Sequence, residues 1–554
     1  ITNLALHYTP DEIQFYLIDF KKGVEFRTYA ANRLPHARVV AIESDREFGL
    51  SVLERLDEIL QERGELFRSR GVQDVPSFRR QFPGEAMPRL LLLIDEFQEF
   101  FTSEDRVASR ASLLLDRLIR QGRAFGIHVL LGSQTLGGAY SLARSTLGQV
   151  AIRIALQCSE SDAHLILSEE NSAARLLTRP GEAIYNDANG MVEGNHPFQI
   201  AWLDEDHREQ LIHDMLIRPD ASRFASGGMV VFEGNVPPAA ELCAPLNAWL
   251  RQEADATRRA SDCVPIWIGE PVAIAAPTSI ELRRASGQNL LIVGQDNDMA
   301  DSILAMCLMC CAAETPAGET TEDVLLQDSA AEGTATPTKT ARVAMLRDTR
   351  DRDSMARFDQ LLSCLPESAA AIYEGNVVDQ VIAELHEDLV RRESDPQEAD
   401  QRERVLLIRN IGQFRSLRKD DDEFGFGGFG EAKAETPASR LSDLVKRGPL
   451  VGIHVIVWSD TFNNAIRWLS NTLMREFENR IAFRMNQTDS ASLIDTPMAS
   501  ALGPGRAILY RDQTGSTEKL RPFAWPGNLW IEQASQIWKG SPGDDLDIDS
   551  LTIE

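Results

Sequence analysis

Long apolar runs are absent from this sequence. Nowhere among the 554 residues do about 20 consecutive apolar residues occur, the number that a membrane-spanning helix needs, and we recognise no secretory signal peptide. Cysteine is scarce as well: there are seven, an odd number without regular spacing, which excludes a disulfide framework and is typical of a reducing cytoplasm. Cys307, Cys310 and Cys311 lie at helical spacing among Met and Leu, which favours core packing over a metal site. We therefore expect a cytoplasmic chain without a transmembrane segment.

Positive charge is also in short supply. Lys and Arg total 57 against 84 Asp and Glu, which gives a formal net charge of -27. That balance argues against a surface that coats nucleic acid, although a narrow channel lined by basic loops stays compatible with it. The hydrophobic fraction of 43% and the charged fraction of 25% are those of an ordinary globular protein. Because the chain is longer than one core supports, we expect two or more domains.

One apolar stretch organises the first half of the chain. The leucines and isoleucine at 90–94 are typical of a strand buried on both faces of a parallel sheet, and this strand ends in Asp95 and Glu96. Ligands of such sheets bind at the carboxyl ends of the strands. Asp95 would therefore lie where the Mg²⁺ of a nucleotide can be held, and Glu96 where a carboxylate can orient or deprotonate an attacking water. The alternative is a core strand followed by a helix N-terminus, where both residues are favoured anyway.

A second polar group follows the next expected strand. A helix expected over 106–121 carries leucines on one face and leads into Arg123, and an apolar strand then ends in Ser133 and Gln134. Since parallel strands end at one edge of their sheet, Gln134 would lie near the two carboxylates. From there it could reach a γ-phosphate or the water that attacks it.

The chain also contains an internal repeat. Gly-Ile-His at 126–128 recurs at 452–454, Arg-Ile-Ala at 153–155 recurs at 480–482, and Pro-Gly at 180–181 recurs at 504–505. Three motifs in one order at nearly constant spacing indicate two copies of one α/β domain. We expect the following parts: a first domain at 1–205, a connecting segment at 206–265, a second domain at 266–535 and an acidic tail at 536–554.

Together these motifs resemble the FtsK/SpoIIIE family of motor ATPases, RecA-like proteins of the FtsK–HerA class. The resemblance rests on a strand followed by Asp19-x-Lys21, on Asp95-Glu96, on Arg123 before the first Gly-Ile-His, and on Ser-Gln at 133–134. It covers nearly the whole first copy and, more weakly, the second. It implies an α/β fold of two tandem RecA-like P-loop-type domains, with mostly parallel central sheets flanked by helices.

The resemblance also implies roles and cofactors. ATP and Mg²⁺ would bind the first copy, with Asp95 as the Mg²⁺-organising carboxylate and Glu96 as the catalytic one. Gln134 would sense the γ-phosphate. Arg123, or Arg120 one turn earlier, would be an arginine finger that acts on the nucleotide of a neighbouring subunit. The alternative for both arginines is a cation favoured by the helix C-terminus or paired with surface acids.

The first copy departs from the family pattern in one respect. No Gly-x-x-x-x-Gly-Lys-Ser/Thr loop, the Walker A motif, occurs anywhere in the chain. The family places this loop just before the helix whose end the residues after Ile1 resemble. We therefore expect the fragment to begin after the phosphate loop and, by itself, to hydrolyse ATP poorly or not at all.

The second copy departs further and resembles a degenerate site. The glycine, lysine and serine of the phosphate loop fall on Met299, Ala300 and Asp301, and acidic side chains there would repel phosphate. Arg409 and Asn410 stand where the first copy has its two carboxylates. We expect this copy neither to bind ATP tightly nor to hydrolyse it, and to have a structural or regulatory role.

Three functions are compatible with these features. The leading hypothesis is an ATP-driven motor of the FtsK/SpoIIIE type that moves double-stranded DNA through a homo-oligomeric ring, a hexamer in the full-length protein. The alternative is a protein-translocating ATPase like EccC or EssC of type VII secretion, which the acidic composition fits somewhat better. A non-catalytic assembly scaffold is the third. A membrane attachment through a segment preceding Ile1 is compatible with all three.

Overall fold

The computed structural model describes residues 1–21, 24–135, 148–217, 228–251, 263–313, 341–366, 368–395, 402–419 and 435–538. The chain divides into two compact units. The first unit consists of Ile1–Val236 with Val272–Ile274, and the second of Pro237–Pro271 with Ala275–Glu554. Most of the expected acidic tail, 539–554, lies outside the described residues.

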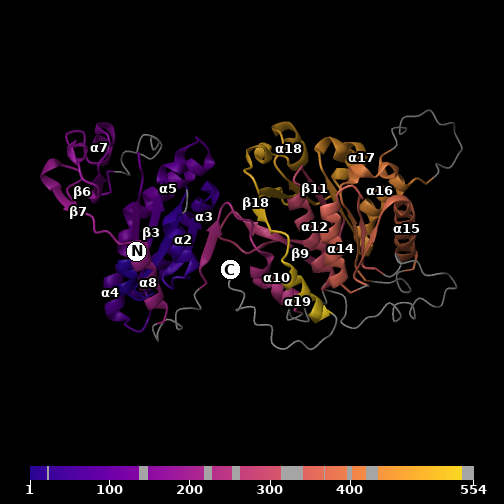
Figure 1. Ribbon diagram of the computed structural model, residues 1–554, viewed down its shortest axis with the longest axis horizontal. Coiled ribbons are helices and arrows are strands. Elements are labelled where there is room, and N and C mark those ends of the chain that lie inside the picture. The colour runs from indigo at the N-terminus through magenta and orange to yellow at the C-terminus, as the bar shows by residue number, and fades with distance from the viewer. Residues whose placement is uncertain are drawn as a thin grey trace. The chain divides into compact units, whose positions relative to one another are not determined.

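A parallel five-stranded sheet forms the centre of the first unit (Figure 1). Its strands, in spatial order, are β4 (Ile127–Leu131), β3 (Arg89–Asp95), β1 (Ile13–Asp19), β2 (Ala37–Ile42) and β8 (Val230–Glu233). Alternate side chains of β3 point to opposite faces of the sheet. Leu90, Leu92 and Ile94 pack on one face and Leu91 and Leu93 on the other, which explains why this strand is apolar throughout.

Helices cover both faces of this sheet. α3 (Arg46–Arg70) and α5 (Arg106–Gln121) share a hydrophobic core with one face. α1 (Thr2–His7), α2 (Val24–Ala31) and α8 (Glu205–Leu216) contribute to the core on the other face. The result is a three-layer α/β/α arrangement that leaves the carboxyl ends of the strands free of helix packing.

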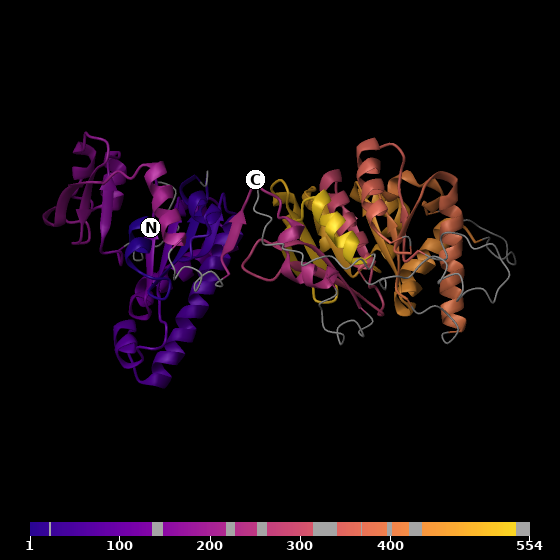
Figure 2. The same ribbon diagram turned by 60° about the horizontal axis from the view of Figure 1, so that its bottom comes forward.

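The long helix α3 continues past the sheet, as Figure 2 shows, and ends in a small core of its own with α4 (Val75–Gln81). Arg63 joins this extension to the sheet, because its guanidinium donates to the carbonyls of Phe125 at 2.6 Å and Pro88 at 2.9 Å. Only 8% of Arg63 is exposed. Burial lowers the pKa of Arg63 to about 10, so the charge itself is held at a cost.

Replacing Arg63 by Met should lower the free energy of unfolding of the first unit by about 2 kcal/mol. The loss comes from two carbonyl groups left without a donor, partly offset by the removed buried charge. Hydrogen exchange of the β3 amides in urea measures the change. Arg68→Met, an exposed position five residues further along α3, is the control and should change the value by less than about 0.5 kcal/mol. Equal values for the two variants would contradict the bridging role.

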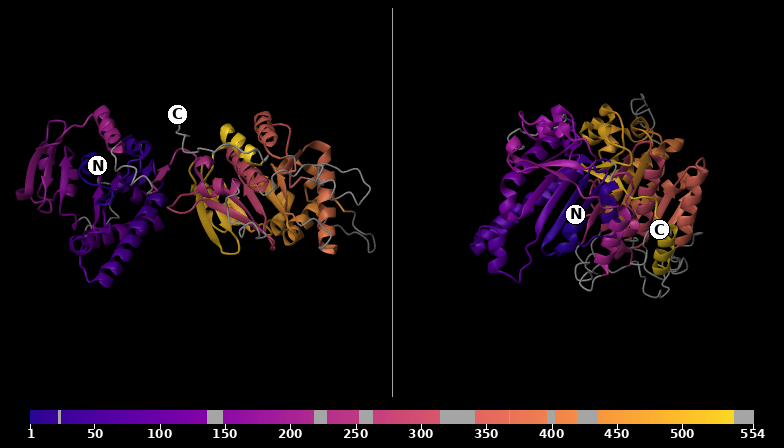
Figure 3. Two further views of the ribbon diagram at one scale, coloured as in Figure 1. Left: turned by 90° about the horizontal axis from the view of Figure 1, so that it is seen from below. Right: turned by 60° about the vertical axis from the view of Figure 1, so that its left-hand side comes forward.

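Three further strands of the first unit form a separate antiparallel sheet (Figure 3). They are β5 (Arg153–Leu156), β6 (Glu182–Asn186) and β7 (Asn195–Gln199). Ala155 and Ile184 pack on one face, in a small core with α7 (Glu160–Ile166). Ile154 and Leu156 project from the other face of β5, and each is 51% exposed.

The second unit is built on one ten-stranded sheet. Its strands, in spatial order, are β13 (Ala370–Tyr373), β12 (Val343–Leu346), β14 (Arg404–Ile408), β15 (Ile453–Ser459), β11 (Leu290–Val293), β16 (Asn479–Ala482), β17 (Ala507–Arg511), β18 (Ser516–Pro522), β9 (Cys263–Pro271) and β10 (Thr278–Arg283). Neighbours from β13 to β16 are parallel, and neighbours from β16 to β10 are antiparallel.

Helices again lie on both faces of this sheet (Figures 1 and 3). One face packs on α10 (Ala244–Leu250), α12 (Asn297–Ala312), α14 (Arg352–Cys364) and α19 (Asn528–Trp538). The other packs on α15 (Val378–Ser394), α16 (Pro437–Arg447), α17 (Phe462–Met474) and α18 (Gln487–Ile494). α12 is buried on all sides, and Cys307, Cys310 and Cys311 pack in its core contacts.

The strand order confirms the internal repeat. β4-β3-β1-β2 in the first unit has the same order as β15-β14-β12-β13 in the second. The expected fold class is therefore confirmed: two tandem α/β domains with mostly parallel sheets flanked by helices. Across the described ranges, no helix has both the length and the apolar content that a bilayer crossing demands.

Candidate nucleotide site

Three strands of the first unit end together at one edge of the sheet. Asp19 closes β1 and lies directly beside Asp95, the last residue of β3. Gly132 follows β4, and its N–H donates to the carbonyl of Ile94. A Cβ atom at Gly132 would lie 2.9 Å from the Asp95 carboxylate, so only glycine leaves the space in front of that carboxylate open. The sheet thus brings acidic groups and a glycine to the edge where ligands of parallel sheets bind.

Glu96 is held in place by ionic and hydrogen-bond partners. Only 2% of the residue is exposed. Lys21 Nζ lies 3.3 Å from Glu96 Oε2, and the Gln98 amide donates to the same oxygen. The Glu96 backbone is left-handed, with φ 54° and ψ 44°, a conformation that costs a glutamate about 1 kcal/mol or more. Non-glycine residues with a strained backbone, such as Glu96, are typical of functional sites.

A hydrogen-bonded chain links Glu96 to the end of the next strand. Ser133 Oγ donates to Gln98 Oε1 at 2.6 Å, and Gln98 in turn donates to Glu96. Gln134 follows Ser133 and is exposed at this same edge. Its amide makes no hydrogen bond to any described residue, so it is available for a ligand. The structure therefore brings Asp95, Glu96 and Gln134 to one edge, as the sequence predicts.

Asp95 has the surroundings of a cation ligand. Burial, together with the neighbouring Asp19 and Glu96 charges, raises the pKa of Asp95 above its ordinary value. Among the described residues no Lys or Arg forms an ion pair with Asp95. Two adjacent carboxylates without a counter-ion fit Mg²⁺, which takes one or two protein carboxylates and completes its shell with water and phosphate. Asp95 and Asp19 would be these ligands.

Replacing Asp95 by Asn should stabilise the first unit at neutral pH by about 0.5 kcal/mol, a small value because water screens this half-exposed carboxylate. A carboxyl whose folded pKa is raised binds more protons when folded than when unfolded, so its charge costs stability above the folded pKa. The gain should shrink as pH falls through the raised pKa and vanish below the unfolded pKa of about 3.9. Urea unfolding at neutral pH and near pH 5 measures it, with Glu104→Gln as the control. A pH-independent gain would contradict this origin.

Arg120 and Arg123 lie at the opposite end of the sheet. Both precede β4, whereas Asp95 and Glu96 follow β3, and the two strands are parallel. Neither arginine can therefore reach the carboxylates of its own unit. Arg120 is paired with Asp116 at 2.8 Å on its own helix. The Arg123 side chain is exposed and forms no ion pair or hydrogen bond with the part of the chain that the structure describes. This placement is compatible with the predicted role in a neighbouring subunit and equally with a solvated surface cation.

Two arginines stand at the equivalent edge of the second unit. By strand register Arg347 and Arg409 take the places of Asp19 and Asp95. Asn410 takes the place of Glu96 and has the same left-handed backbone, with φ 55°. Asparagine tolerates this conformation far better than glutamate does. The comparison supports a chemical reason for Glu96, since the fold alone would be served by asparagine.

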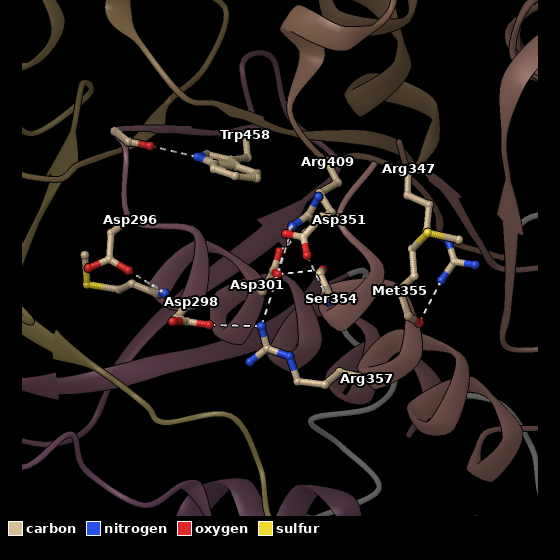
Figure 4. A network of polar contacts seen from close by, with 12 residues as sticks. Asp296, Asp298, Asp301, Arg347, Asp351, Ser354, Met355, Arg357, Arg409 and Trp458 are labelled. Atoms are coloured by element: carbon tan, nitrogen blue, oxygen red, sulfur yellow. Dashed lines mark hydrogen bonds and ion pairs between the residues drawn. The ribbon is translucent and has the colours of Figure 1, made fainter. Parts of the chain in front are cut away.

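The expected phosphate-loop positions of the second unit lie in the first turns of α12. Met299 and Ala300 offer no polar side-chain group to a phosphate. Asp301 is fully buried and paired with Arg409, at 2.7 Å between Asp301 Oδ1 and Arg409 Nε (Figure 4). The structure therefore brings Asp301 and Arg409 together, which their separation in sequence does not suggest.

Comparison with known proteins finds a family whose model matches the part of the chain that forms this site. The model of the FtsK/SpoIIIE family matches residues 1–138, which contain Asp19, Asp95, Glu96 and Gln134. Residues 1–138 of the first unit therefore match an FtsK/SpoIIIE-family domain. The chain is also similar to the ESX-5 secretion system protein EccC5 of Mycobacterium tuberculosis, with 35% identity over 150 residues, 24% of this chain and 10% of that protein. The matched segment is thus only about a tenth of the relative's length.

Solved structures extend the likeness in fold to both units. The cytoplasmic domain of the type VII secretion ATPase EccC from Thermomonospora curvata matches 97% of this chain and 60% of its own, with a TM-score of 0.57 and 16% identity. ATPases 2 and 3 of EssC from Geobacillus thermodenitrificans match 94% of this chain and 87% of their own, with a TM-score of 0.50 and 14% identity. The chain therefore has the fold of tandem FtsK/SpoIIIE-type ATPase domains.

Sequence reasoning gave no role to four groups of this site. Asp19, Lys21 and Ser133 were noted only as parts of the family motif, and Gln98 was not noted at all. The position of Asp19 is visible in the sequence, because it closes an apolar strand as Asp95 does. The contact of Gln98 with Ser133 carries no such signal, since it joins residues 35 positions apart in the sequence.

Proposed function

We propose that this chain is part of an ATP-driven, protein-secreting motor of the EccC/EssC type, in which the first unit hydrolyses ATP and the second is structural or regulatory. The supporting observation is the carboxylate edge formed by Asp19, Asp95 and Glu96, in a chain that shares 35% identity with a secretion protein over 150 residues. A net charge of -27 suits a protein substrate better than a polyanion.

Each group at this edge has a task in hydrolysis. Asp95 and Asp19 would hold the Mg²⁺ that accompanies ATP, and the bound ion would neutralise charge on the phosphates. Glu96 accepts the proton of the attacking water, and Lys21 and Gln98 keep its carboxylate at a fixed position. Gln134 orients the water or the γ-phosphate through its free amide.

The phosphate-binding loop would enter between two open strand edges. In the second unit β11 pairs with β15 on one side and β16 on the other. Among the described residues of the first unit, no such strand lies between the matching strands β4 and β5. Leu130 and Ile154 are 48% and 51% exposed, whereas their counterparts Ile456 and Ile481 are fully buried. A strand, a phosphate loop and a helix supplied by sequence outside residues 1–554 would complete the first site.

The active assembly would be a homo-oligomeric ring, for which we propose a hexamer. Arg123, directed away from its own carboxylates, would then reach the nucleotide of the neighbouring subunit. The chain would work in the cytoplasm, as the solved part of EccC is a cytoplasmic domain. A membrane attachment through a preceding segment is part of this proposal.

Translocation of double-stranded DNA is the second candidate function, and the likeness to the DNA translocase FtsK of Chlorobaculum tepidum, 28% identical over 140 residues, supports it. The two candidates separate in one experiment on the full-length protein. ATP hydrolysis is measured alone, with double-stranded DNA, and with a protein that the same cells secrete. At least about tenfold stimulation by the protein and none by DNA is expected. Stimulation by DNA that Glu96→Gln abolishes would overturn the secretion proposal in favour of a DNA motor.

A further inference from the structure

The degenerate site of the second unit contains a buried ion pair in bidentate geometry. Arg409 Nε lies 2.7 Å from Asp301 Oδ1, and Arg409 Nη2 lies 3.0 Å from Asp301 Oδ2 (Figure 4). Asp301 is 0% exposed and Arg409 is 4% exposed. The hydrogen bonds that Arg409 donates to Asp301 and Asp351 outweigh burial and raise the pKa of Arg409. Bidentate pairs of this kind are the strongest and most direction-specific that arginine makes.

The pair is the centre of a larger cluster, which we call the Arg409 cluster. Asp351 accepts from Arg409 at 2.9 Å, and Ser354 Oγ donates to Asp301 at 2.6 Å. Arg357 lies 3.6 Å from Asp301. These groups come from three elements: the first turns of α12, the end of β14 and the start of α14. The cluster therefore ties together the elements that surround the phosphate position of a P-loop fold.

The helix N-terminus at this position is already occupied by a carboxylate. Asp296 accepts a hydrogen bond from the Met299 N–H at 3.0 Å and so caps α12. Helix N-termini bind phosphate because their first N–H groups are free and the dipole favours negative charge. Here an internal acid takes that place. Asp298, paired with Arg357 at 2.9 Å, adds a further negative charge in the first turn of α12.

We propose that the Arg409 cluster is an internal substitute for bound nucleotide and Mg²⁺ in the second unit. A nucleotide and its cation join the phosphate-loop helix to the ends of neighbouring strands through opposite charges. Asp301 and Arg409 make the same connection with the chain's own charges. Trp458, whose ring lies 5.4 Å from the Arg409 guanidinium, closes the cluster on one side and donates to the Gly294 carbonyl.

This assignment has a consequence for assembly. A P-loop unit that depends on nucleotide gains stability with nucleotide concentration. A unit that carries its own substitute is complete at every nucleotide concentration. The second unit would then present a constant surface to its partners while the first unit passes through its hydrolysis cycle. The inference concerns the second unit alone and does not depend on catalysis by the first.

Thermal unfolding of the 554-residue chain tests the proposal, with tryptophan fluorescence as the signal. Seven of the eight tryptophans belong to the second unit, and the eighth, Trp202, is 90% exposed and reports little. Millimolar ATP with Mg²⁺ should leave this transition within about 1 °C of its value without nucleotide. Arg409→Met should lower Tm by about 10 °C, because Asp301 is left charged and buried.

Two further variants make the test specific. Asp301→Leu combined with Arg409→Met removes both charges and should recover more than half of the lost Tm. Arg415→Met, an exposed arginine six positions along, removes the same charge and should change Tm by less than about 2 °C. Hydrogen exchange in Arg409→Met should rise together at the first turns of α12 and α14 and after β14. A merely local pair would raise it near Arg409 alone.

Either of two results would overturn the proposal. One is an increase of the wild-type transition by more than about 5 °C with ATP and Mg²⁺, because the site would then take nucleotide. The other is an Arg409→Met variant indistinguishable from Arg415→Met. If Arg409→Met does not fold, Arg409→Lys decides, since it keeps the charge and loses the bidentate geometry. For Arg409→Lys we expect a fall in Tm of about 5 °C, half of that expected for Arg409→Met. An unchanged Tm would overturn the assignment.

Discussion

Replacing Glu96 by Gln in the full-length protein is expected to lower kcat for ATP hydrolysis by about 10²–10⁴-fold, with nucleotide affinity unchanged. Gln has the size of Glu and can keep the contact to Gln98, but it cannot take a proton from water. Glu96 is 2% exposed and bound by Lys21 at 3.3 Å, so no solvent carboxylate can take its place. Steady-state hydrolysis and equilibrium binding of ATP measure the two quantities.

Glu99→Gln is the matched control for this prediction. Glu99 also lies near Lys21, at 3.6 Å, but its side chain is 30% exposed, whereas that of Glu96 is 3% exposed. Its replacement should change kcat by less than about threefold. If Glu96→Gln kept more than about a tenth of the wild-type kcat, the proton acceptor would have to be another group.

Replacing Arg123 by Ala should lower kcat by about 10³-fold, the size of effect that arginine fingers have in related phosphoryl transfer. The activity should return in part when this variant is mixed with Glu96→Gln. Each site would combine Glu96 of one subunit with Arg123 of its neighbour, so random mixing in equal amounts restores about a quarter of the interfaces. Hydrolysis by the mixture, compared with each variant alone, is the measurement.

Arg120→Ala serves as the control for the arginine finger. Arg120 is paired with Asp116 on its own helix, and its loss should cost little activity. The internal repeat also favours Arg123 as the arginine finger, because the degenerate second copy has Pro449 at the position of Arg123. If a mixture of the Arg123→Ala and Glu96→Gln variants hydrolysed no more ATP than either variant alone, Arg123 would not act in the neighbouring subunit.

The central strand of the first unit was predictable because its signal is local. Five apolar residues in succession at 90–94 require burial on both faces, and only a parallel sheet between two helical layers supplies that. Once the strands are parallel, Asp95, Glu96 and Gln134 must share an edge. Their placement thus follows from sequence, whereas their catalytic roles remain predictions.

The contacts that hold the site were beyond sequence reasoning. Ser133 reaches Gln98 across 35 positions, and Arg409 reaches Asp301 across 108. Each contact joins a residue just after one strand to a residue of a helical segment: Ser133 after β4 to Gln98, and Arg409 after β14 to Asp301 in α12. From the sequence alone, Arg409 is seen only as the residue that replaces an aspartate of the first copy. In the structure Arg409 and Arg347 take the positions that Asp95 and Asp19 have in the first unit.

The separate sheet of β5, β6 and β7 was also not predicted. In the second unit the counterparts of its strands are joined to the parallel sheet through β11. The described residues of the first unit contain no strand equivalent to β11. Ile154 is therefore 51% exposed, whereas its counterpart Ile481 is fully buried.

The central claim is that nucleotide acts at the first unit and that the second unit carries its own substitute. Hydrogen exchange of the full-length Glu96→Gln protein, with and without ATP and Mg²⁺, tests it most directly. We predict slower exchange in the segments that follow β1, β3 and β4 of the first unit, and no change at the first turn of α12. Protection at α12, or none after β3, would contradict the account.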